Sequence, residues 1–238
     1  MISIIIPTFN EIEHGYLEDI LSKYQSIADI EIICVDSNSD DGTKALIQQS
    51  DAYLISTNKY NRAARINEGI LQAKGDLILL HHPRSILPIE AIDSLQQYKQ
   101  TKYFWGGFKH QFDLKHPFLS FISWYSNQVR FIKKNIVYLD HCIFLTKDLA
   151  SLYFPIQELD IFEDTLISEL LSQNNQPQML NYPVMTSSIR FQQNGIYKQW
   201  LSNQLLKFCY KIGISDHKMN RFYEKNCPLN VKKSTYKK

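Results

Sequence analysis

The sequence lacks a strong excess of charge and any long apolar run. Its 26 basic and 24 acidic residues leave a formal net charge of +2, which creates no global field that would attract nucleic acid or an anionic surface. No uninterrupted apolar stretch reaches the roughly 20 residues that cross a bilayer. We therefore expect no nucleic-acid partner and no membrane-spanning segment, and we look for function in local sites.

Paired cysteines and a leader segment are also lacking. The four cysteines lie far apart in the chain, so neither a disulfide framework nor a zinc motif is indicated. Met1 is followed directly by the apolar run from Ile2 to Ile6, without a basic leader or a small-residue cleavage site, so no signal peptide is expected. We expect a cytoplasmic protein with free thiols, whose only contact with a membrane would be at its surface.

What the sequence contains is the pattern of an α/β fold. Apolar runs at residues 2–6 (stopped by Pro7), 30–35, 52–55 and 76–80 predict four strands, and helical spacing predicts a helix between each pair of them. This alternation is typical of a mostly parallel sheet flanked by helices. Ligands of such sheets bind beyond the carboxyl ends of the strands, which selects the loops at those ends.

Beyond about residue 100 the pattern changes. Strands are predicted at 103–112 and 143–145, with an aromatic-rich segment at 118–131 between them. Residues 200–212 carry apolar side chains at helical intervals, which predicts a helix that either packs on the domain or lies on a membrane surface. The final lysines, from Lys232 onward, indicate a solvated end or a contact with a membrane or an acidic partner.

Three polar segments follow the predicted strands. Residues 7–11 and 36–43 place small and acidic side chains at the mouth of the sheet, either to accept hydrogen bonds from a base or ribose or simply as turns, which are rich in these residues. Arg62 and Arg65 fall in the first turn of a helix, where cations oppose the helix dipole. A bound diphosphate would offset that cost, and so would an ion pair with the acidic loop 36–41.

These segments resemble a known family. The motifs that carry the resemblance are residues 2–11 (ISIIIPTFNE), 35–43 (VDSNSDDGT), 61–69 (NRAARINEG), 73–76 (AKGD), 138–141 (YLDH), 162–164 (FED), 186–191 (TSSIRF), 203–206 (NQLL) and 213–215 (GIS). Their order is similar to that of family 2 glycosyltransferases, and in particular to the bacterial branch of radical-SAM/selenodomain-associated transferase 2. The resemblance spans nearly the whole chain.

The resemblance implies a GT-A fold and an enzyme that moves a sugar from a nucleotide-sugar to a glycan, lipid or small-molecule acceptor. It implies one domain over residues 1–215, with a nucleotide-sugar-binding half at 1–100 and an acceptor half at 101–215, followed by a C-terminal tail at 216–238. The implied donor-binding residues are Pro7, Thr8, Asn10, Glu11, Asp36, Asn38, Arg62, Arg65 and Asn67. Arg84, Asp140 and His141 would lie on the acceptor or leaving-group side.

In that family an acidic pair supplies the catalytic base, which here corresponds to Asp164 with Glu163 beside it. Apolar residues at helical spacing from Leu166 to Leu171 place Asp164 in the first turn of a helix. A base there would take the proton from an acceptor hydroxyl and invert the anomeric centre. The alternative is that both carboxylates only stabilise the helix dipole.

The fourth strand departs from the family pattern. Family members carry an acidic residue here that holds the divalent cation at the leaving diphosphate, whereas this chain has Pro83 after His81 and His82. Hard cations such as Mg²⁺ prefer oxygen ligands. Three interpretations follow: Mn²⁺ or a softer ion on His81 or His82, no metal with Arg84 or Arg62 neutralising the leaving group, or loss of activity. We favour a divalent cation that is weakly bound or absent.

Two other functions remain alternatives. The missing acidic residue is consistent with a non-catalytic module of the same fold that binds a nucleotide or sugar. A nucleotidyltransferase is the other alternative, since α/β sheets with acidic loops also bind nucleoside triphosphates, but the sequence has no glycine-rich phosphate loop.

Overall fold

The computed structural model describes residues 1–225 and 227–229. The terminal lysines from Lys232 onward lie outside the described residues. The strands are β1 (Ile2–Thr8), β2 (Ile30–Asp36), β3 (Tyr53–Ser56), β4 (Leu77–Leu80), β5 (Ser85–Ile86), β6 (Trp105–Phe112), β7 (Ile143–Thr146) and β8 (Gln178–Thr186). The α-helices are α1 (Tyr16–Tyr24), α2 (Thr43–Gln48), α3 (Arg62–Gln72), α4 (Ile89–Ser94), α5 (Pro117–Tyr125), α6 (Ile132–Lys134), α7 (Lys147–Tyr153), α8 (Glu163–Leu171), α9 (Ile189–Asn194), α10 (Ile196–Lys211) and α11 (Asp216–Glu224).

The described residues also form four helical segments that are not α-helical. Three are 3₁₀ turns, η1 (Ile12–His14), η2 (Leu95–Tyr98) and η4 (Leu139–His141), and the fourth, η3 (Ser126–Phe131), is π-helical. η3 joins α5 to α6, so that the predicted aromatic segment forms one long helix with a π-helical middle. Single π-helical turns of this kind are often found at functional sites.

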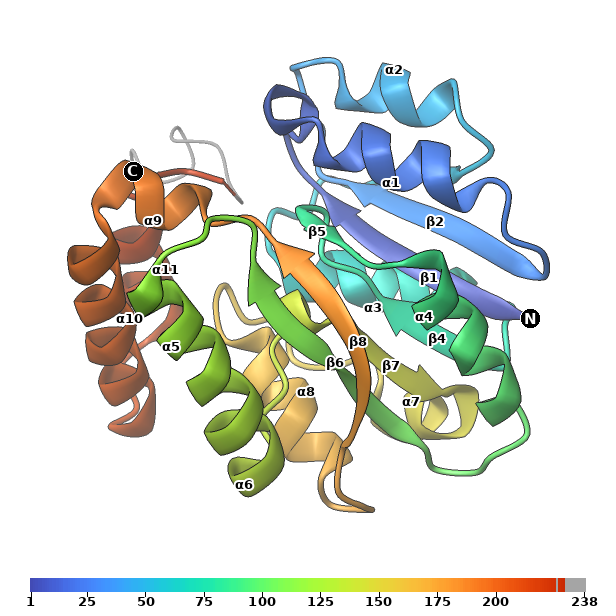
Figure 1. The fold of residues 1–238 in the computed structure, drawn as a ribbon. Coiled ribbons are helices and arrows are strands. Elements are labelled where there is room, and N and C mark those ends of the chain that lie inside the picture. Colours follow the sequence, from blue (N-terminus) through green and yellow to red (C-terminus); the bar gives the residue numbers. More distant parts are fainter. Residues whose placement is uncertain (226, 230–238) are drawn as a thin grey trace.

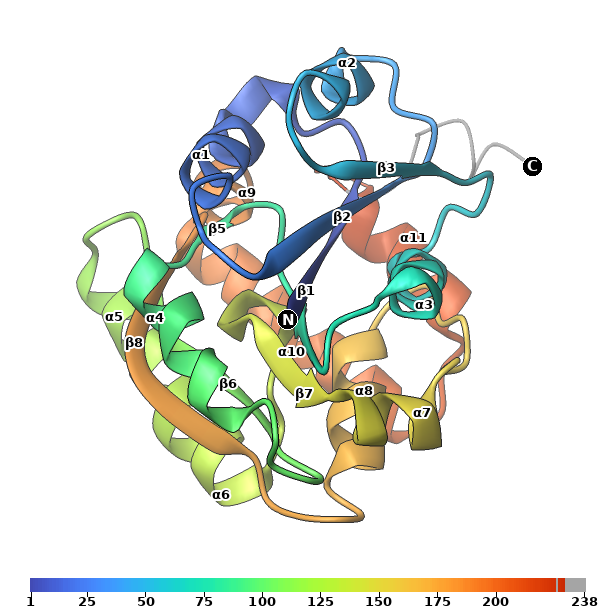
Figure 2. The ribbon, with the colours of Figure 1, turned by 90° about the vertical axis from the view of Figure 1, so that its right-hand side faces the viewer.

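One sheet of eight strands, in the order β3-β2-β1-β4-β7-β6-β8-β5, runs through the molecule. β1 pairs in parallel with β2 and β4, and β2 with β3, as the alternation of strands and helices predicts. β7 then lies antiparallel to β4, and β6 lies between β7 and β8 (Figure 2). Helices cover both faces (Figure 1), which confirms the predicted α/β fold, and strands β1 to β4 form the predicted parallel part of a mixed sheet.

Pro7 does not stop the first strand, contrary to the prediction. β1 runs on to Thr8, with Pro7 opposite Val35 of β2. Thr8 directs its carbonyl oxygen towards β2, where the Ser37 N–H donates to it at 3.2 Å. The backbone groups of alternate residues in a strand form hydrogen bonds on opposite sides. Those of Pro7 are therefore directed towards β4, and the pairing of β1 with β4 has already ended at Ile5. Its missing N–H therefore costs the sheet no hydrogen bond.

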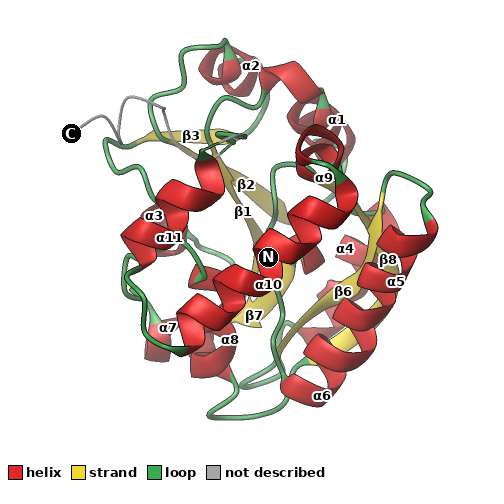
Figure 3. Ribbon diagram, turned by 90° about the vertical axis from the view of Figure 1, so that its left-hand side faces the viewer, coloured by secondary structure: helices red, strands yellow, loops and turns green. Residues whose placement is uncertain are grey.

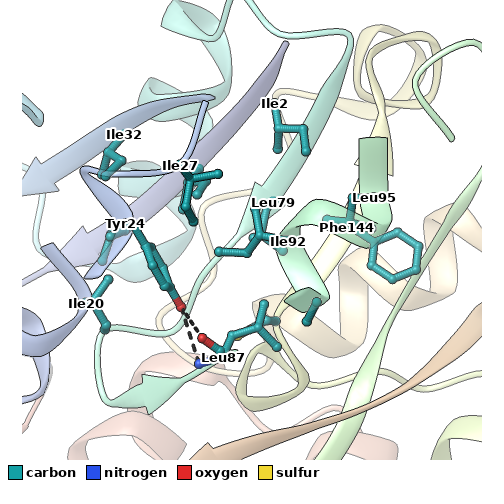
Figure 4. Packing of buried hydrophobic residues seen from close by; sticks show 14 of the residues in the cluster. Ile2, Ile20, Tyr24, Ile27, Ile32, Leu79, Leu87, Ile92, Leu95 and Phe144 are labelled. Atoms are coloured by element: carbon teal, nitrogen blue, oxygen red, sulfur yellow. Dashed lines mark hydrogen bonds between the residues drawn. The ribbon is translucent and has the colours of Figure 1, made fainter. Parts of the chain in front are cut away.

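Two hydrophobic clusters hold the sheet from its two faces. Alternate residues of β1 enter opposite clusters: Ile4 packs with α1 and α4, and Ile5 packs with α3, α7 and α8. In the first cluster the Tyr24 hydroxyl donates to the Leu87 carbonyl at 3.0 Å (Figure 4). This bond satisfies the one polar group of a buried aromatic side chain and ties α1 to the segment after β5.

The helix predicted at 200–212 is part of α10, but most of its apolar side chains do not pack on the domain. Leu201, Leu205 and Phe208 are exposed, whereas the buried residues of α10 are Gln199 and Leu206. The inner side of α10 is largely polar because it lines a cavity. Residues 216–224, which the sequence assigns to a tail, form α11, and none of the described helices is long and apolar enough to cross a membrane.

Candidate active site

A cavity of about 230 Å³ lies beyond the carboxyl ends of β4, β6 and β8. Its walls come from the start of α3 and α8, the loop after β4, η3, η4, α10 and α11. The position follows the rule for α/β sheets, because polar groups that do not fit into the sheet collect where its strands end. Both predicted halves of the chain contribute to it, since Arg62 and Arg84 face residues from α8 and α10.

The loops after β1 and β2 are tied to each other rather than to the cavity. Asp36 accepts a hydrogen bond from Thr8 Oγ1 at 3.1 Å and from the Ser39 N–H at 2.8 Å. Asn10 donates to Asp40 Oδ1 at 3.0 Å and accepts from the Asp40 N–H at 3.1 Å. Part of the polar capacity of these loops is thus used within the protein, as the turn interpretation expects.

Pro7 and Asn38 are also in contact with other parts of the protein and not with the cavity. Pro7 is buried in the ladder with β2, and Asn38 donates to Asn58 at 2.7 Å and accepts from Lys44 at 3.2 Å. None of the predicted base- and ribose-binding residues lines the cavity, namely Pro7, Thr8, Asn10, Glu11, Asp36 and Asn38. Their role as a nucleotide site stays a prediction, and the site would lie beside the cavity.

Glu11 and Arg84 form a buried ion pair at the edge of the cavity. Arg84 Nη1 lies 3.2 and 3.1 Å from the two carboxylate oxygens of Glu11, and it also donates to the Leu229 carbonyl at 3.3 Å. Burial raises the pKa of the Glu11 carboxyl, and the Arg84 charge counteracts this. Arg84 also lines the cavity, with its charge partnered by Glu11, and its role on the acceptor or leaving-group side stays a prediction.

Arg62 is paired with the predicted catalytic residues and not with the acidic loop. Its Nε contacts Glu163 Oε1, and its Nη2 lies 4.0 Å from Asp164 Oδ2. Burial lowers the pKa of Arg62, but the charges of Glu163 and Asp164 outweigh this and raise it above its ordinary value. The positive charge of Arg62 at the start of α3 is thus compensated by Glu163 and Asp164. These two carboxylates lie in the first turn of α8, where negative charge is favourable for the dipole of α8.

Arg65 and Asn67 serve the fold directly. Arg65 Nη1 donates to the Thr8 carbonyl at 2.8 Å, and burial together with the Arg62 charge lowers its pKa to about 10. The Asn67 side chain donates to the Ile156 carbonyl and accepts from the Ile156 N–H, both at 2.9 Å. Neither residue lines the cavity, so α3 uses them to hold the loops after β1 and before α8.

The residues after β4 do not form the divalent-cation site that family 2 enzymes imply. His81 lies 2.9 Å from the Tyr24 hydroxyl through Nε2 and 3.0 Å from the His82 carbonyl through Nδ1, so both nitrogens have protein partners. His82 Nδ1 accepts from the Arg84 N–H at 3.1 Å, which places the hydrogen of the neutral ring on Nε2. Among the described residues no group of three or more His, Cys, Asp or Glu could hold a metal ion.

Burial keeps both imidazoles neutral. It lowers the pKa of His81 to about 4, and burial with the Arg84 and Arg62 charges puts that of His82 well below its ordinary value. In this arrangement Nε2 of His82, a residue of the cavity wall, carries a hydrogen instead of a lone pair. The predicted metal ligands therefore do not fit a cation.

Asp164 is a carboxylate whose surroundings favour its protonated form. It lines the cavity at the first turn of α8, where its side chain is 13% exposed. Burial and the neighbouring charge of Glu163 raise its pKa to about 7, whereas Arg62 counteracts the rise. The Leu139 and Thr165 N–H groups donate to it at 3.3 and 2.7 Å and fix the orientation of the carboxylate.

Asp140 shares the cavity wall with His110, a residue that the sequence analysis did not identify. His110 Nε2 lies 3.5 Å from Asp140 Oδ2, and neither His110 Nε2 nor Asp140 Oδ1 has a hydrogen-bond partner within the described residues. Burial lowers the pKa of His110. A neutral imidazole beside a carboxylate can bind a hydroxyl, since the pair offers both a donor and an acceptor.

His141 lies behind this wall and does not reach the cavity. Its Nδ1 is 2.8 Å from the Phe108 carbonyl, its Nε2 is 2.9 Å from Ser126 Oγ, and the ring is fully buried. Burial lowers its pKa to about 4. The structure therefore places His141 as a support for η4, and the neighbour Asp140 alone faces the cavity.

Arg130 and Lys207 are further cavity residues that the sequence did not reveal. Arg130 lies over the rings of Tyr125 and Tyr138, 5.2 Å from each centroid, and Lys207 lies 5.9 Å from that of Tyr138. Burial and the Arg130 charge lower the pKa of Lys207 to about 7. The motif at 203–206, next to Lys207, was the one sequence feature that pointed to this part of the cavity. Lys207 itself was not predicted, because a lysine in a helix is ordinarily a solvated side chain.

Comparisons with known proteins identify the fold and the family. A family model described as Glycosyl transferase family 2 matches residues 3–147. The structure of S. aureus TarS 1-349 aligns with a TM-score of 0.61 and 16% identity, over 86% of this chain and 65% of that one. Its complex with UDP-GlcNAc aligns with a TM-score of 0.61 and 17% identity, over 79% and 58% of the two chains.

A second enzyme gives the same result. Glucosyl-3-phosphoglycerate synthase from Mycobacterium tuberculosis, in complex with Mn²⁺, UDP and glucosyl-3-phosphoglycerate, aligns with a TM-score of 0.52 and 14% identity, over 79% of this chain and 70% of that one. No curated protein matches in a sequence search. At these identities the neighbours establish the fold, which is the predicted GT-A fold, and this chain spans about two thirds of the length of TarS 1-349. Because the family model covers more than half of its residues, the chain belongs to the family 2 glycosyltransferases.

Proposed function

We propose that this protein transfers a sugar from a nucleotide-sugar donor to an acceptor hydroxyl, with inversion and with Asp164 as the general base. Asp164 accepts the proton of the acceptor hydroxyl while that oxygen attacks the anomeric carbon. The bond from this carbon to the diphosphate oxygen breaks on the opposite side, and the nucleoside diphosphate leaves. One displacement of this kind inverts the anomeric configuration.

The observation that carries the proposal is the position of Asp164 on the cavity wall together with its raised pKa. A general base works best when its pKa lies near the working pH, and about 7 meets that condition. Glu163 has a different environment, because it is almost fully buried against Arg62. The two neighbouring carboxylates thus divide into a base and a positioning residue that keeps Arg62 next to it.

The donor would be bound by the loops after β1 and β2, with its diphosphate directed towards the cavity. UDP is the nucleotide to test first, since TarS and glucosyl-3-phosphoglycerate synthase are both described in complex with it. Arg84 is the cation at the end of β4, close to where the family places its metal. We propose that Arg84 stabilises the leaving diphosphate, while His110 and Asp140 bind hydroxyls of the acceptor.

The organisation of the chain belongs to the same proposal. Residues 1–100 would bind the donor and residues 101–215 the acceptor, within one domain that α11 extends. The four cysteines are free, which suits the reducing cytoplasm where we place the protein.

The test is Asp164→Asn, assayed for transfer or donor hydrolysis with UDP-sugars and for UDP binding by thermal shift. We expect turnover to fall by about 10²-fold or more, with the shift caused by UDP unchanged. Asp148→Asn is the matched control, because Asp148 is also a first-turn carboxylate but lies exposed on α7. Turnover retained in the Asp164 variant would exclude this residue as the base.

A non-catalytic binding module is the second candidate, and two observations favour it. Pro83 stands near the family's metal-binding acidic residue, and Arg62 is occupied by Glu163. UDP binding without transfer or hydrolysis of any UDP-sugar, with Mn²⁺ and with EDTA, would support this candidate over the enzyme.

A further inference from the structure

Helix α10 exposes a continuous apolar stripe. Tyr197, Leu201, Leu205 and Phe208 recur three or four residues apart, and each is between 51% and 66% exposed. This spacing puts the four side chains on one side of the helix. The opposite side carries Gln199, which is buried beside the cavity. The exposed apolar stripe of α10 therefore faces away from the protein.

Helix α5 extends the stripe into a broader face. Phe118 contacts the ring of Tyr197, with centroids 4.9 Å apart, and stacks towards Phe121, which in turn stacks towards Trp124. Phe121 and Trp124 are 48% and 54% exposed. Figure 3 shows α10 running across the molecule with α5 and α6 beside it. We call the exposed apolar side chains of α5 and α10 the α5–α10 face.

The charged residues of the two segments that build this face are all positive. The whole chain has about one acidic residue in ten, yet residues 114–139 and 189–215 contain none. Each of these two segments has four basic residues, which include the exposed Lys133 and Lys198. An apolar surface whose own segments carry cations and no carboxylates is complementary to a bilayer with anionic headgroups.

We propose that the α5–α10 face docks on the surface of an anionic lipid bilayer. The exposed rings and leucines enter the boundary between headgroups and acyl chains, while the lysines contact the headgroups. A symmetric pairing with a second copy is disfavoured, because it would bring the same cations together. Arg130 and Lys207 line the cavity from η3 and α10, so docking brings that wall of the cavity to the membrane.

The test is flotation of the full chain with vesicles of phosphatidylcholine alone or mixed with phosphatidylglycerol. We expect the protein to float with the anionic vesicles and to dissociate at high ionic strength, because the headgroup contacts are screened by salt. Absence of flotation with anionic vesicles at low ionic strength would overturn the proposal, and so would equal binding to both kinds of vesicle.

Two pairs of variants locate the contact. The first variant combines three substitutions on the α5–α10 face, Trp124→Ser, Leu201→Ser and Phe208→Ser. It should reduce binding to anionic vesicles by about tenfold or more, since the apolar area that enters the bilayer is lost. The matched control is Leu71→Ser with Leu152→Ser, two leucines of α3 and α7 that are 79% and 58% exposed. The control should float like the wild type, and equal loss in both variants would contradict docking through this face.

The second pair concerns the charges. Lys133→Glu with Lys198→Glu should abolish the preference for anionic vesicles, whereas Lys102→Glu with Lys109→Glu, exposed lysines outside the two acid-free segments, should not. Sedimentation velocity gives the competing outcome. If the wild type is a dimer, the serine variant a monomer, and neither binds vesicles, the face belongs to a second copy and the proposal fails.

Discussion

Asp164 is a buried carboxylate whose ionised form the folded protein disfavours. Its pKa is about 7 in the fold and ordinarily 3.8. Between these two values the folded chain keeps the proton that the unfolded chain releases, so the free energy of unfolding decreases as the pH rises. Above pH 7 the whole of this destabilisation is present.

This sign leads to a prediction on stability. Asp164→Asn removes the ionisable group at this position. At pH 8 the free energy of unfolding of the variant should exceed that of the wild type by at least about 1 kcal/mol, and at pH 4 the two values should be nearly equal. Urea unfolding across the pH range measures the difference. Asp148→Asn, at an exposed site, should show no such trend. Parallel pH profiles for the wild type and Asp164→Asn would contradict the raised pKa.

At the scale of elements, Arg62 joins the start of α3 to the start of α8. Its partner Glu163 has a side chain only 2% exposed, and a buried carboxylate without its cation is costly. Asn67 of α3 adds two hydrogen bonds to Ile156, in the loop that precedes α8. These contacts hold Asp164 at the cavity, and they depend on residues about a hundred positions apart.

Removing one partner should therefore cost more than removing both. Arg62→Met should lower the free energy of unfolding by about 3 kcal/mol, and Arg62→Met with Glu163→Gln should recover much of that loss. Lys59→Met is the control, since Lys59 pairs with Glu158 between neighbouring segments at the surface, and should change stability by less than about 1 kcal/mol. Equal losses in the single and double variants would show that the pairing itself has no role.

At the scale of the whole molecule, the cavity receives cations from both halves of the chain, and among the described residues no group of three or more His, Cys, Asp or Glu could hold a metal ion. Arg84 comes from the parallel half, and Arg130 and Lys207 come from the second half. The negative charge of a diphosphate would be balanced mainly by side chains that are part of the fold. Binding should then need little help from a divalent cation.

A thermal-shift series tests this. UDP should raise the melting temperature by the same amount with Mn²⁺ and with EDTA, because the stabilisation by a ligand depends on its affinity and the affinity should not depend on the metal. Arg84→Gln should lower the shift, whereas Lys102→Gln, at an exposed site that does not line the cavity, should not. A shift that appears only with Mn²⁺ would show that a metal carries the diphosphate.

The sequence alone was sufficient to predict the strands and the parallel pairing of the first half of the sheet. Strands buried on both faces produce continuous apolar runs, and their alternation with helices leaves few topologies. The start of α8 at Glu163 and Asp164 was also predictable, since an acidic first turn precedes a regular apolar face. The continuation of β1 past Pro7 was not, because it depends on where the neighbouring strand β4 ends.

The composition of the cavity was decided by the tertiary structure. Arg62, Arg65 and Asn67 look alike in sequence, as polar residues of one helix, but they contact Glu163, Thr8 and Ile156 respectively. Likewise Asp140 and His141 are neighbours in sequence, yet one faces the cavity and the other supports it from behind.

The same reason explains α10. Periodicity marks which side of a helix is apolar, but not whether that side is covered. The sequence by itself determined the family, the parallel half of the sheet and the candidate base. Which charges meet, which histidine nitrogens are occupied and which apolar face stays open were decided by contacts between segments far apart in the chain, and local sequence patterns carry no information about such contacts.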